Sequence, residues 1–511
     1  MGNFMKLAKT KSYPYIFEKQ ERKVPSPETL MLMPRELVEE FQAFIFNKKG
    51  RKVEIAALNP ENSSLQHFVN ERFGKSVKWY STKKEDVSFI LKHYARDFKE
   101  DISRLMSVGV GTNGNIVELV NLIIGYAIAE EASDVHVEPS RNESIIRFRV
   151  DGILHQVLSL PKDIHTAVVA RFKIMANLKI DDYRHPQDGR IELERYTNIS
   201  LRISTMPTLY GEKIALRILD DSHKDLSIQH LGFSEEHEKT IMKNVEKPFG
   251  MIVASGPTGC GKTTTLYGLL HLLKKDKINI STLEDPIEYA MDGVNQIQIN
   301  PRANLTFASG LRSLLRQDPD VMMVGEIRDS ETAIMASEAA LTGHLVLTTL
   351  HTNDAVSVIT RFLEMKVEEF AVASTLNVII AQRLVRKVCD VCGKEKPIDD
   401  VIFKKIRERK DIVDALRTMG KDLKDLAQQK FLFGEGCDAC MHTGYRGRVG
   451  IFEVLEVNKS IYDLIIEHAP SERIKNEAAK FGFYEMMVDG LEKVFKGITT
   501  FEEVLRATRN T

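Results

Sequence analysis

The sequence predicts an α/β protein whose central domain binds phosphate. A glycine-rich segment, Gly256–Thr263 (GPTGCGKT), fits G-x-x-x-x-G-K-[ST] at every fixed position. The apolar run Met251–Ala254 precedes it as a buried strand, and leucines at helical spacing follow it within Thr264–Lys274. Strand, glycine loop and helix in this order form the context in which the motif binds phosphate.

The physical basis of this loop is anion binding. Glycines let the chain turn so that backbone N–H groups point at phosphate, and the helix N-terminus adds its positive end. Lys262 is expected to reach the β- and γ-phosphates, and the Thr263 hydroxyl to bind Mg²⁺. The expected nucleotide-binding residues are Gly256, Pro257, Thr258, Gly259, Cys260, Gly261, Lys262, Thr263 and Thr264.

Length and charge set the broad class of the protein. A chain of 511 residues predicts three or four domains. Seventy-one Lys and Arg against 72 Asp and Glu argue against nucleic acid as the main partner. The start lacks a long apolar stretch, and the apolar segment Ile116–Ala129 is too short to span a bilayer. We therefore expect a cytoplasmic protein that meets a membrane only through partners.

Residues 31–108 predict a small α/β docking module and a linker, after a flexible lead-in over residues 1–30. No residue in this module is of a catalytic type. The expected elements are a helix and strand within Glu36–Phe46, a strand at Lys52–Leu58, a helix at Ser64–Phe73 capped by Ser63, a strand at Val77–Tyr80, a helix at Asp86–His93 and a linker at Tyr94–Asn115.

Residues 109–229 predict a second, α+β domain. Its expected elements are a helix from Ile116 capped by Asn115, strands at 135–137, 145–150 and 153–158 with a hairpin turn at Asp151-Gly152, a helix at 164–177, and strands at 190–193, 199–204 and 214–218. Five arginines lie on these strands: Arg147, Arg149, Arg190, Arg202 and Arg217. Such arginines usually form a solvated face, but an arginine from a neighbouring domain or subunit can stabilise charge on a transferring phosphate.

Residues 230–380 predict the phosphate-binding domain, in which three strands end in chemically active groups. Glu284 and Glu288 follow the run Ile278–Leu283, Glu326 follows Val321–Val324, and His351 follows Leu345–Leu350. The carboxyl ends of parallel strands meet at one edge of a doubly wound sheet, where ligands bind. We expect these four groups to converge on the γ-phosphate and its Mg²⁺, although each alone could be a helix cap or a surface charge.

Residues 381–455 predict a zinc-binding region, followed by a helical C-terminal region over 456–511. Two pairs, Cys389-x-x-Cys392 and Cys437-x-x-Cys440, supply four soft ligands for one structural zinc. The pairs lie 44 residues apart, Gly393 to Gly436, so two thiol pairs without a metal remain the alternative. The intervening segment is charged and helical in pattern.

Several further segments resemble a known family. They are Ala132–Pro139 (ASDVHVEP), Pro186–Arg190 (PQDGR), Pro207–Arg217 (PTLYGEKIALR), Thr282–Tyr289 (TLEDPIEY), Leu315–Asp329 (LRQDPDVMMVGEIRD) and Thr342–Asp354 (TGHLVLTTLHTND). Together with the phosphate loop, they follow the motif order of the secretion-superfamily ATPases of type II secretion and type IV pilus assembly. The resemblance runs from about residue 109 to the C-terminus.

This resemblance implies an architecture and a function. The fold would be a RecA-like ATPase domain preceded by a PAS-like α+β domain. The protein would be a cytoplasmic homohexamer, peripheral to the inner membrane, that hydrolyses ATP with Mg²⁺ and carries Zn²⁺. Its partners would be an inner-membrane platform protein and a cytoplasmic docking protein, with indirect membrane contact and no nucleic acid.

The resemblance also implies roles for single residues. Glu288 would orient the attacking water as general base, with Glu284 as the open alternative, and Glu326 would act on Mg²⁺. His344 and His351 would sense phosphate or conformation. Arg202 and Arg217 would reach the nucleotide's phosphates.

Three alternatives remain at this point. A retraction or DNA-uptake motor is disfavoured, because such motors typically lack the zinc element and the large N-terminal module. A low-turnover nucleotide-binding switch is disfavoured by the intact motifs, and a zinc-ribbon nucleic-acid protein by the near-neutral charge.

Two features depart from the family pattern. The stretch Leu32–Leu91 resembles the family only weakly and lacks the motif by which some relatives bind cyclic-di-GMP. Cys260 is either a neutral spacer, which we favour, or a site of thiol oxidation.

Overall fold

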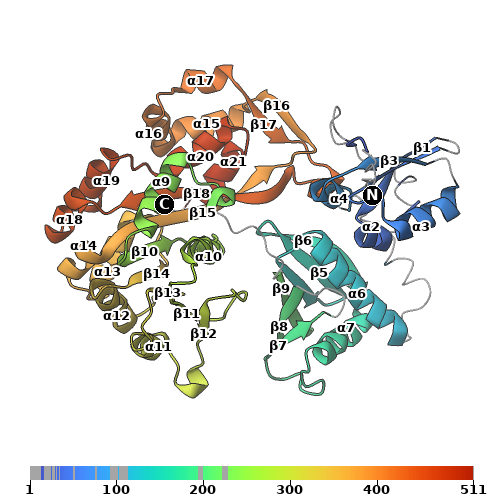
Figure 1. Ribbon diagram of the computed structural model, residues 1–511, viewed down its shortest axis with the longest axis horizontal. Coiled ribbons are helices and arrows are strands. Elements are labelled where there is room, and N and C mark those ends of the chain that lie inside the picture. The colour runs from blue at the N-terminus through green and yellow to red at the C-terminus, as the bar shows by residue number, and fades with distance from the viewer. Residues whose placement is uncertain are drawn as a thin grey trace, which may run out of the picture. The chain divides into compact units, whose positions relative to one another are not determined.

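The chain divides into two compact units in this computed structural model (Figure 1). The first unit contains residues 1–191 and 202–218, and the second contains residues 192–201 and 219–511. The structure describes residues 13–16, 25, 29, 32–33, 35–49, 52–74, 77–91, 102, 113–193, 199–220 and 228–509. Most of the lead-in and of the linker expected from the sequence lie outside these residues. Residues 13–16 of the expected flexible lead-in are described and are paired with Ser81, whose N–H donates to Pro14 and whose carbonyl oxygen accepts from Ile16, which corrects the expectation for this stretch.

In the described residues of the N-terminal module, a three-stranded sheet packs with three helices of several residues each. Its sheet has the order β1-β2-β3, with β1 antiparallel and β3 parallel to β2. The elements are α2 (Arg35–Phe41), β1 (Ala43–Lys49), β2 (Lys52–Ala57), α3 (Ser63–Phe73), β3 (Val77–Ser81) and α4 (Lys84–Leu91). The expected elements are confirmed, except that Asn62 caps α3: its side chain accepts from the N–H of Leu65, and Ser63 is already helical.

The α+β domain is a six-stranded sheet with two long helices, as the sequence predicts. Its strand order is β6-β5-β4-β9-β8-β7. The elements are α6 (Asn113–Ala129), β4 (Asp134–Pro139), β5 (Glu143–Val150), β6 (Ile153–Pro161), α7 (Lys162–Met175), β7 (Gln187–Glu192), β8 (Ile199–Thr208) and β9 (Gly211–Asp220). Asp151 and Gly152 both have positive φ, as a two-residue hairpin turn requires. Asn115 lies inside α6 rather than before it, which corrects the expected cap.

The second unit is built on a seven-stranded sheet of order β12-β11-β13-β14-β10-β15-β18 (Figure 1). All paired neighbours are parallel except β18, which is antiparallel to β15. The strands are β10 (Gly250–Ser255), β11 (Ile280–Glu284), β12 (Asn295–Gln298), β13 (Val321–Val324), β14 (Leu345–Leu350), β15 (Leu376–Val388) and β18 (Tyr445–Glu456). This arrangement confirms the predicted doubly wound sheet.

Helices cover both faces of this sheet, so its strands are apolar on both sides. In β10, Met251 and Val253 pack into the core on one face, and Ile252 and Ala254 into the core on the other. One face is covered by α8 (Ile228–Leu231), α9 (Glu235–Val245) and α10 (Lys262–Leu273). The opposite face is covered by α11 (Phe307–Leu314), α12 (Ser330–Leu341), α13 (Val356–Glu364), α14 (Glu369–Thr375), α18 (Lys459–Ile466) and α19 (Ser471–Ala479). Continuous apolar runs are expected of such fully buried strands.

The segment between the cysteine pairs packs against the C-terminal helices in a further hydrophobic core. It is formed by α15 (Asp400–Glu408), α16 (Lys410–Thr418), α17 (Leu423–Gln428), β17 (Lys430–Gly434), α20 (Met486–Phe495) and α21 (Phe501–Ala507), and β16 (Gly393–Pro397) pairs with β17. The ring of Phe431 lies 5.5 Å from that of Phe495 and 5.0 Å from that of Phe501. The expected border at 380/381 falls inside β15, because β15 continues the central sheet into this core.

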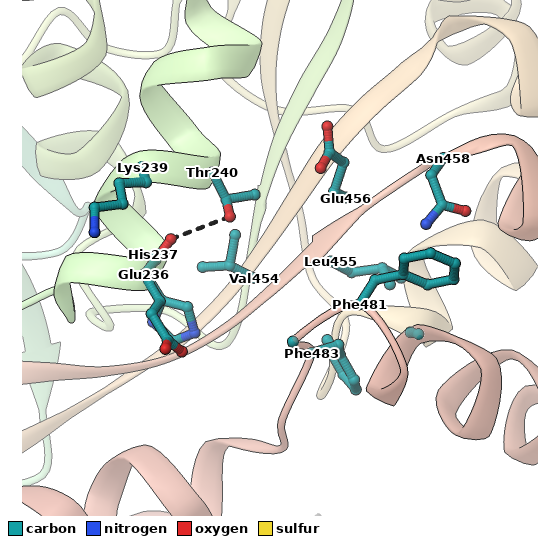
Figure 2. Close-up of a pocket in the computed structure, with 12 residues that line it drawn as sticks. Glu236, His237, Lys239, Thr240, Val454, Leu455, Glu456, Asn458, Phe481 and Phe483 are labelled. Carbon is teal, nitrogen blue, oxygen red and sulfur yellow. Dashed lines mark hydrogen bonds between the residues drawn. The ribbon is translucent and has the colours of Figure 1, made fainter.

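A cavity of about 360 Å³ lies between α9, the end of β18 and the segment 478–483 (Figure 2). Glu456 at this end of β18 pairs with Val378 near the start of β15, so the cavity is at the amino edge of the sheet. His237 lines it, is 3% exposed, and stacks on Tyr484 with ring centroids 4.6 Å apart. Neither ring nitrogen of His237 has a hydrogen-bond partner. Among the described residues, no helix is both long and apolar enough to cross a membrane.

The buried His237 predicts a loss of stability in acid. Burial, and then the charge of Lys493, lower the pKa of His237 to about 3. The unfolded chain binds a proton at His237 near pH 6.5, so stability falls as the pH drops from there toward 3. At pH 5 this effect amounts to about 2 kcal/mol. We expect His237→Phe, which keeps the stacking, to lose less stability between pH 7.5 and 5 than the wild type in urea unfolding.

The matched control is His271→Gln, which replaces an exposed histidine of the same unit. Its stability should change with pH as in the wild type. Equal slopes for His237→Phe and the wild type would contradict the assignment of this pH dependence to His237.

Candidate active site and metal centre

The phosphate loop joins the end of β10 to the start of α10. Gly256 and Gly261 have φ of 143° and 92°, which side chains rarely adopt. A Cβ at Gly256 would lie 2.5 Å from the carbonyl oxygen of Gln382 and 2.6 Å from Sγ of Cys260. Glycine at 256 is therefore needed both for the turn and for the close approach of β15.

Lys262 and Cys260 are both buried in this loop. The Lys262 Nζ donates to the carbonyl oxygens of Gly256 at 2.7 Å and Pro257 at 3.1 Å. Burial raises the pKa of the Cys260 thiol. A protonated, buried thiol is a poor nucleophile, which favours the neutral role predicted for Cys260.

The fold brings Glu326 and His351 to the edge of the sheet where the phosphate loop lies. Glu326 pairs with Arg328 Nη2 at 2.6 Å and with His351 Nε2 at 3.5 Å. Burial lowers the pKa of His351, and the charge of Lys262 lowers it further, so a neutral imidazole is favoured near pH 7. Of the four groups expected to converge, the structure brings these two, Glu326 and His351, into contact.

Glu284 and Glu288 differ sharply in their surroundings. Glu284 is 2% exposed, and its carboxylate accepts hydrogen bonds from Thr282 Oγ1 at 2.6 Å, Gln296 Nε2 at 3.1 Å and the Tyr267 hydroxyl. Burial raises the pKa of Tyr267, and Glu284 raises it further, so Tyr267 remains a donor. Glu288 lies in the loop after β11 and is half-buried.

His344 does not join the residues at the phosphate loop. It lies immediately before β14, and its carbonyl oxygen accepts from the N–H of Gly250 at the start of β10. Its ring Nδ1 lies 2.9 Å from the carbonyl oxygen of Ala339. Since β10 and β14 are parallel, His344 is at the amino edge of the sheet, whereas His351 is at the carboxyl edge.

The strand arginines of the α+β domain fall into two groups. Arg147 pairs with Glu138 at 2.5 Å, and Arg149 and Arg217 pair with Asp134 at 3.3 and 3.2 Å. Arg202 is exposed, and no ion pair of it is found among the described residues. Arg202 is therefore the more available of the two arginines expected to reach phosphate, Arg202 and Arg217.

Sequence reasoning missed two residues beside the phosphate loop, Gln382 and Arg383. The Gln382 amide accepts from Thr265 Oγ1 at 2.8 Å and donates to the carbonyl oxygen of Cys260 at 2.8 Å. Arg383 Nη2 donates to Asn353 Oδ1 at 3.2 Å. Both residues come directly after the apolar start of β15. Glu284, Glu326 and His351 occupy the same kind of position, at or just after the end of an apolar strand. This shared position is the sequence signal that could have identified Gln382 and Arg383.

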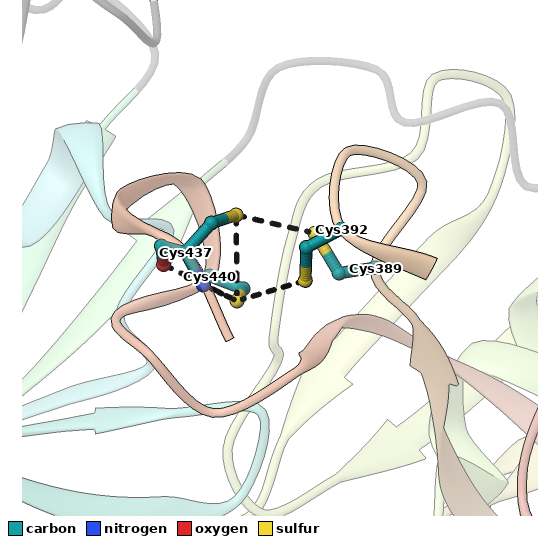
Figure 3. A group of neighbouring side chains, drawn as sticks. All are labelled: Cys389, Cys392, Cys437 and Cys440. Carbon is teal, nitrogen blue, oxygen red and sulfur yellow. Dashed lines mark hydrogen bonds between the residues drawn. The ribbon is translucent and has the colours of Figure 1, made fainter. Parts of the chain in front are cut away.

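The four cysteines form one cluster (Figure 3). Their sulfur atoms all lie within 4.8 Å of one another. The separations are 3.9 Å for Cys389–Cys437, 3.8 Å for Cys392–Cys440 and 3.7 Å for Cys437–Cys440. A tetrahedral zinc with Zn–S bonds of about 2.3 Å places its sulfurs about 3.8 Å apart, so the cluster fits one zinc ion.

The local fold explains how pairs 44 residues apart can share one ion. β16 and β17 run antiparallel with Gly393 opposite Gly434, which brings Cys392 and Cys437 together. Burial raises the pKa of Cys440, but the N–H groups of Cys437 and Gly444 outweigh it and bring the pKa to about 7. These N–H groups stabilise a thiolate, the form that binds zinc.

Comparison with protein families matches nearly the whole chain. The family described as type II/IV secretion system protein matches residues 111–506. The MshEN domain matches residues 12–101, which covers the N-terminal module.

Comparison with characterised proteins finds relatives along most of the chain. It is 37% identical over 503 residues to the type IV pilus assembly ATPase PilB of Myxococcus xanthus, covering 94% of this chain and 87% of that protein. It is 43% identical over 395 residues to the type II secretion system protein E of Pseudomonas aeruginosa, covering 77% and 76% of the two chains.

Solved structures of similar fold include two secretion or pilus ATPases. The Legionella pneumophila ATPase DotB matches with a TM-score of 0.55 at 19% identity, over 76% of this chain and 95% of that one. The pilus retraction motor PilT with bound ADP matches with a TM-score of 0.51 at 24% identity, over 75% and 95%. At these identities the likeness establishes the fold alone.

The cysteine cluster predicts one zinc ion per chain. Cys440→Ser removes one of four thiolate ligands, so we expect zinc, measured by elemental analysis of purified protein, to fall from about one per chain to a small fraction. The unfolding midpoint should fall as well. Cys260→Ser, outside the cluster, is the control and should keep its zinc; undiminished zinc in Cys440→Ser would contradict the shared site.

Proposed function

The chain belongs to the type II/IV secretion system protein family and is an ATP hydrolase with a RecA-like fold, and from this premise we propose that it is a motor for assembly of a type IV pilus or a type II secretion pseudopilus. The motor works as a cytoplasmic homohexamer at the periphery of the inner membrane. It acts on an inner-membrane platform protein and, through its N-terminal module, on a docking protein.

The observation that carries the proposal is the set of groups gathered at the carboxyl edge of the central sheet. The phosphate loop, Glu326 and His351 meet there, as ATP hydrolysis requires. Two further features favour assembly over retraction: the cysteine cluster, and an N-terminal module that matches the MshEN domain. The named assembly ATPases are also similar to this chain over most of both lengths.

The nucleotide site has a defined set of proposed ligands. Backbone N–H groups of the phosphate loop and the Lys262 Nζ bind the phosphates of ATP, with the positive end of α10 behind them. Thr263 and Glu326 hold Mg²⁺, which neutralises phosphate charge. The exposed Thr264 completes the first turn of α10 beside the nucleotide.

Glu288 is the better candidate to orient the attacking water. A general base must be accessible to that water. Glu284 is 2% exposed, and both of its oxygens accept hydrogen bonds from Tyr267, Thr282 and Gln296 in a buried network that positions the loop after β11. Glu288 lies on this loop and is only half-buried, so we assign Glu284 a positioning role and Glu288 the role of base.

A low-turnover nucleotide switch is the alternative function. Its support is that Glu326 is paired with both Arg328 and His351, which would hold it away from a metal until a partner acts. Turnover by the purified protein, or its absence, separates the two functions.

The different roles proposed for Glu288 and Glu284 predict that their variants differ in kcat and in unfolding midpoint. Glu288→Gln should retain ATP affinity but lower kcat by about 100-fold or more, because it removes the base without changing the pocket. Glu284→Gln should lower the unfolding midpoint more than Glu288→Gln does, because it breaks a buried network, and should lower kcat less. Steady-state phosphate release and thermal unfolding of both variants measure this; the reverse ranking in kcat would assign the base to Glu284.

The proposed six-subunit assembly predicts how turnover depends on protein concentration. Turnover per chain should rise with protein concentration as six-subunit particles form, since an arginine from one subunit completes the site of the next. Arg202→Gln should lower kcat by about 100-fold or more while the particle still forms. Arg141→Gln, an exposed arginine of the same unit, is the control. Full turnover by a monomer, established by light scattering in the assay buffer, would contradict the hexameric motor.

A further inference from the structure

Arg383 crosses the end of the strand that leads into the phosphate loop. Ser255, the last residue of β10, pairs with Ala381 of β15 on one side and with Leu350 of β14 on the other. Arg383 extends from β15, yet its Nη2 donates to Asn353, which follows β14. Since neighbouring strands lie about 4.8 Å apart, the side chain must span β10 at the point where the phosphate loop begins.

The Arg383 guanidinium is buried with part of its hydrogen-bonding capacity unused. The residue is 7% exposed, and its Nε has no hydrogen-bond partner. Within the described part of the chain it forms no ion pair with a carboxylate, and the amide oxygen of Asn353 is its one side-chain acceptor. Buried charges are normally paired, so an unpaired buried cation calls for a ligand.

A second buried cation lies beside it. Lys262 is 8% exposed, and its Nζ is bound by two neutral carbonyl oxygens. Burial lowers the pKa of Lys262. The loop that carries Lys262 begins after Ser255, and Arg383 lies two residues beyond Ala381, the partner of Ser255 in β15, so both cations lie at the same edge of the sheet. The negative charge of Glu326 favours the charged form of Lys262, but Glu326 is itself paired with Arg328 and His351.

We propose that Arg383 binds the phosphate chain of the nucleotide held in the loop of its own subunit, as a second cation beside Lys262. An anion at this position would relieve the repulsion between two buried cations and satisfy the unused N–H of the guanidinium. Arginine suits the task because its planar fork can keep the hydrogen bond to Asn353 while it donates to phosphate oxygen. The inference rests on the proposed nucleotide site.

A purely positioning role for Arg383 makes a different prediction. If Arg383 served only to hold the segment after β14 through Asn353, removing either partner of that hydrogen bond would have the same effect. If Arg383 contacts phosphate, Asn353→Ala leaves the cation in place and changes affinity little. The comparison of these two variants therefore separates the roles.

The experiment measures equilibrium binding of ATP, ADP and inorganic triphosphate to the full chain by competition with a fluorescent nucleotide. The variants are Arg383→Gln, Arg383→Lys and Asn353→Ala. Lys387→Gln, an exposed residue of β15 that loses the same charge, is the matched control. Thermal unfolding checks that each variant is folded, and Arg383→Met, of similar volume, replaces Arg383→Gln if the latter fails to fold.

We expect Arg383→Gln to weaken all three ligands about tenfold or more, since a charge-assisted contact is lost. Arg383→Lys should retain part of the affinity, while Asn353→Ala and Lys387→Gln should stay within about threefold of the wild type. Affinity unchanged in Arg383→Gln, or an equal loss in Asn353→Ala, would overturn the role of Arg383. Failure of the wild type to bind ATP would instead overturn the nucleotide site itself.

Discussion

The parallel pairing of β10 with β14 and β15 is the constraint on which the functional part of this protein depends. Ser255 is in register with Leu350 and Ala381, so β10 and β14 end at the same level, and β15 passes this level at Ala381 before it continues to Val388. The phosphate loop, His351 and Arg383 therefore lie at the same edge of the sheet, although they come from three separate segments of the chain. Backbone hydrogen bonds in a sheet buried on both faces hold this level more firmly than side-chain contacts could.

Burial then divides the acidic groups at this edge into different roles. Glu284 is enclosed and saturated with donors, so it behaves as part of the scaffold. Glu326 is held by two partners that can both exchange for other ligands, and Glu288 lies on the loop that Glu284 supports. The chemistry of three similar side chains is thus set by their surroundings rather than by their type.

The parts of the fold and of the site that depend on short stretches of sequence could be predicted. The strands Val321–Val324 and Leu345–Leu350 were predicted to the residue, because a strand buried on both faces is a short, mostly apolar run followed by a polar group. The cysteine cluster followed from spacing and ligand chemistry. The cap of α3 was misplaced by one residue, since Asn62 and Ser63 are equally good cap types and only the backbone decides between them.

Other features depend on pairings that a sequence does not display. β15 and β18 belong to the central sheet, yet they pair across the whole inserted segment, so the expected border fell within β15. Arg383 was missed for the same reason: its position at the phosphate loop depends on its hydrogen bond across the end of β10 to Asn353, which the sequence does not show. The same strand links the two sites of this unit directly: Cys389 follows the end of β15, six residues from Arg383 or about 20 Å along an extended chain. The nucleotide loop and the cysteine cluster are thus attached to opposite ends of one backbone segment, which no side-chain contact needs to bridge.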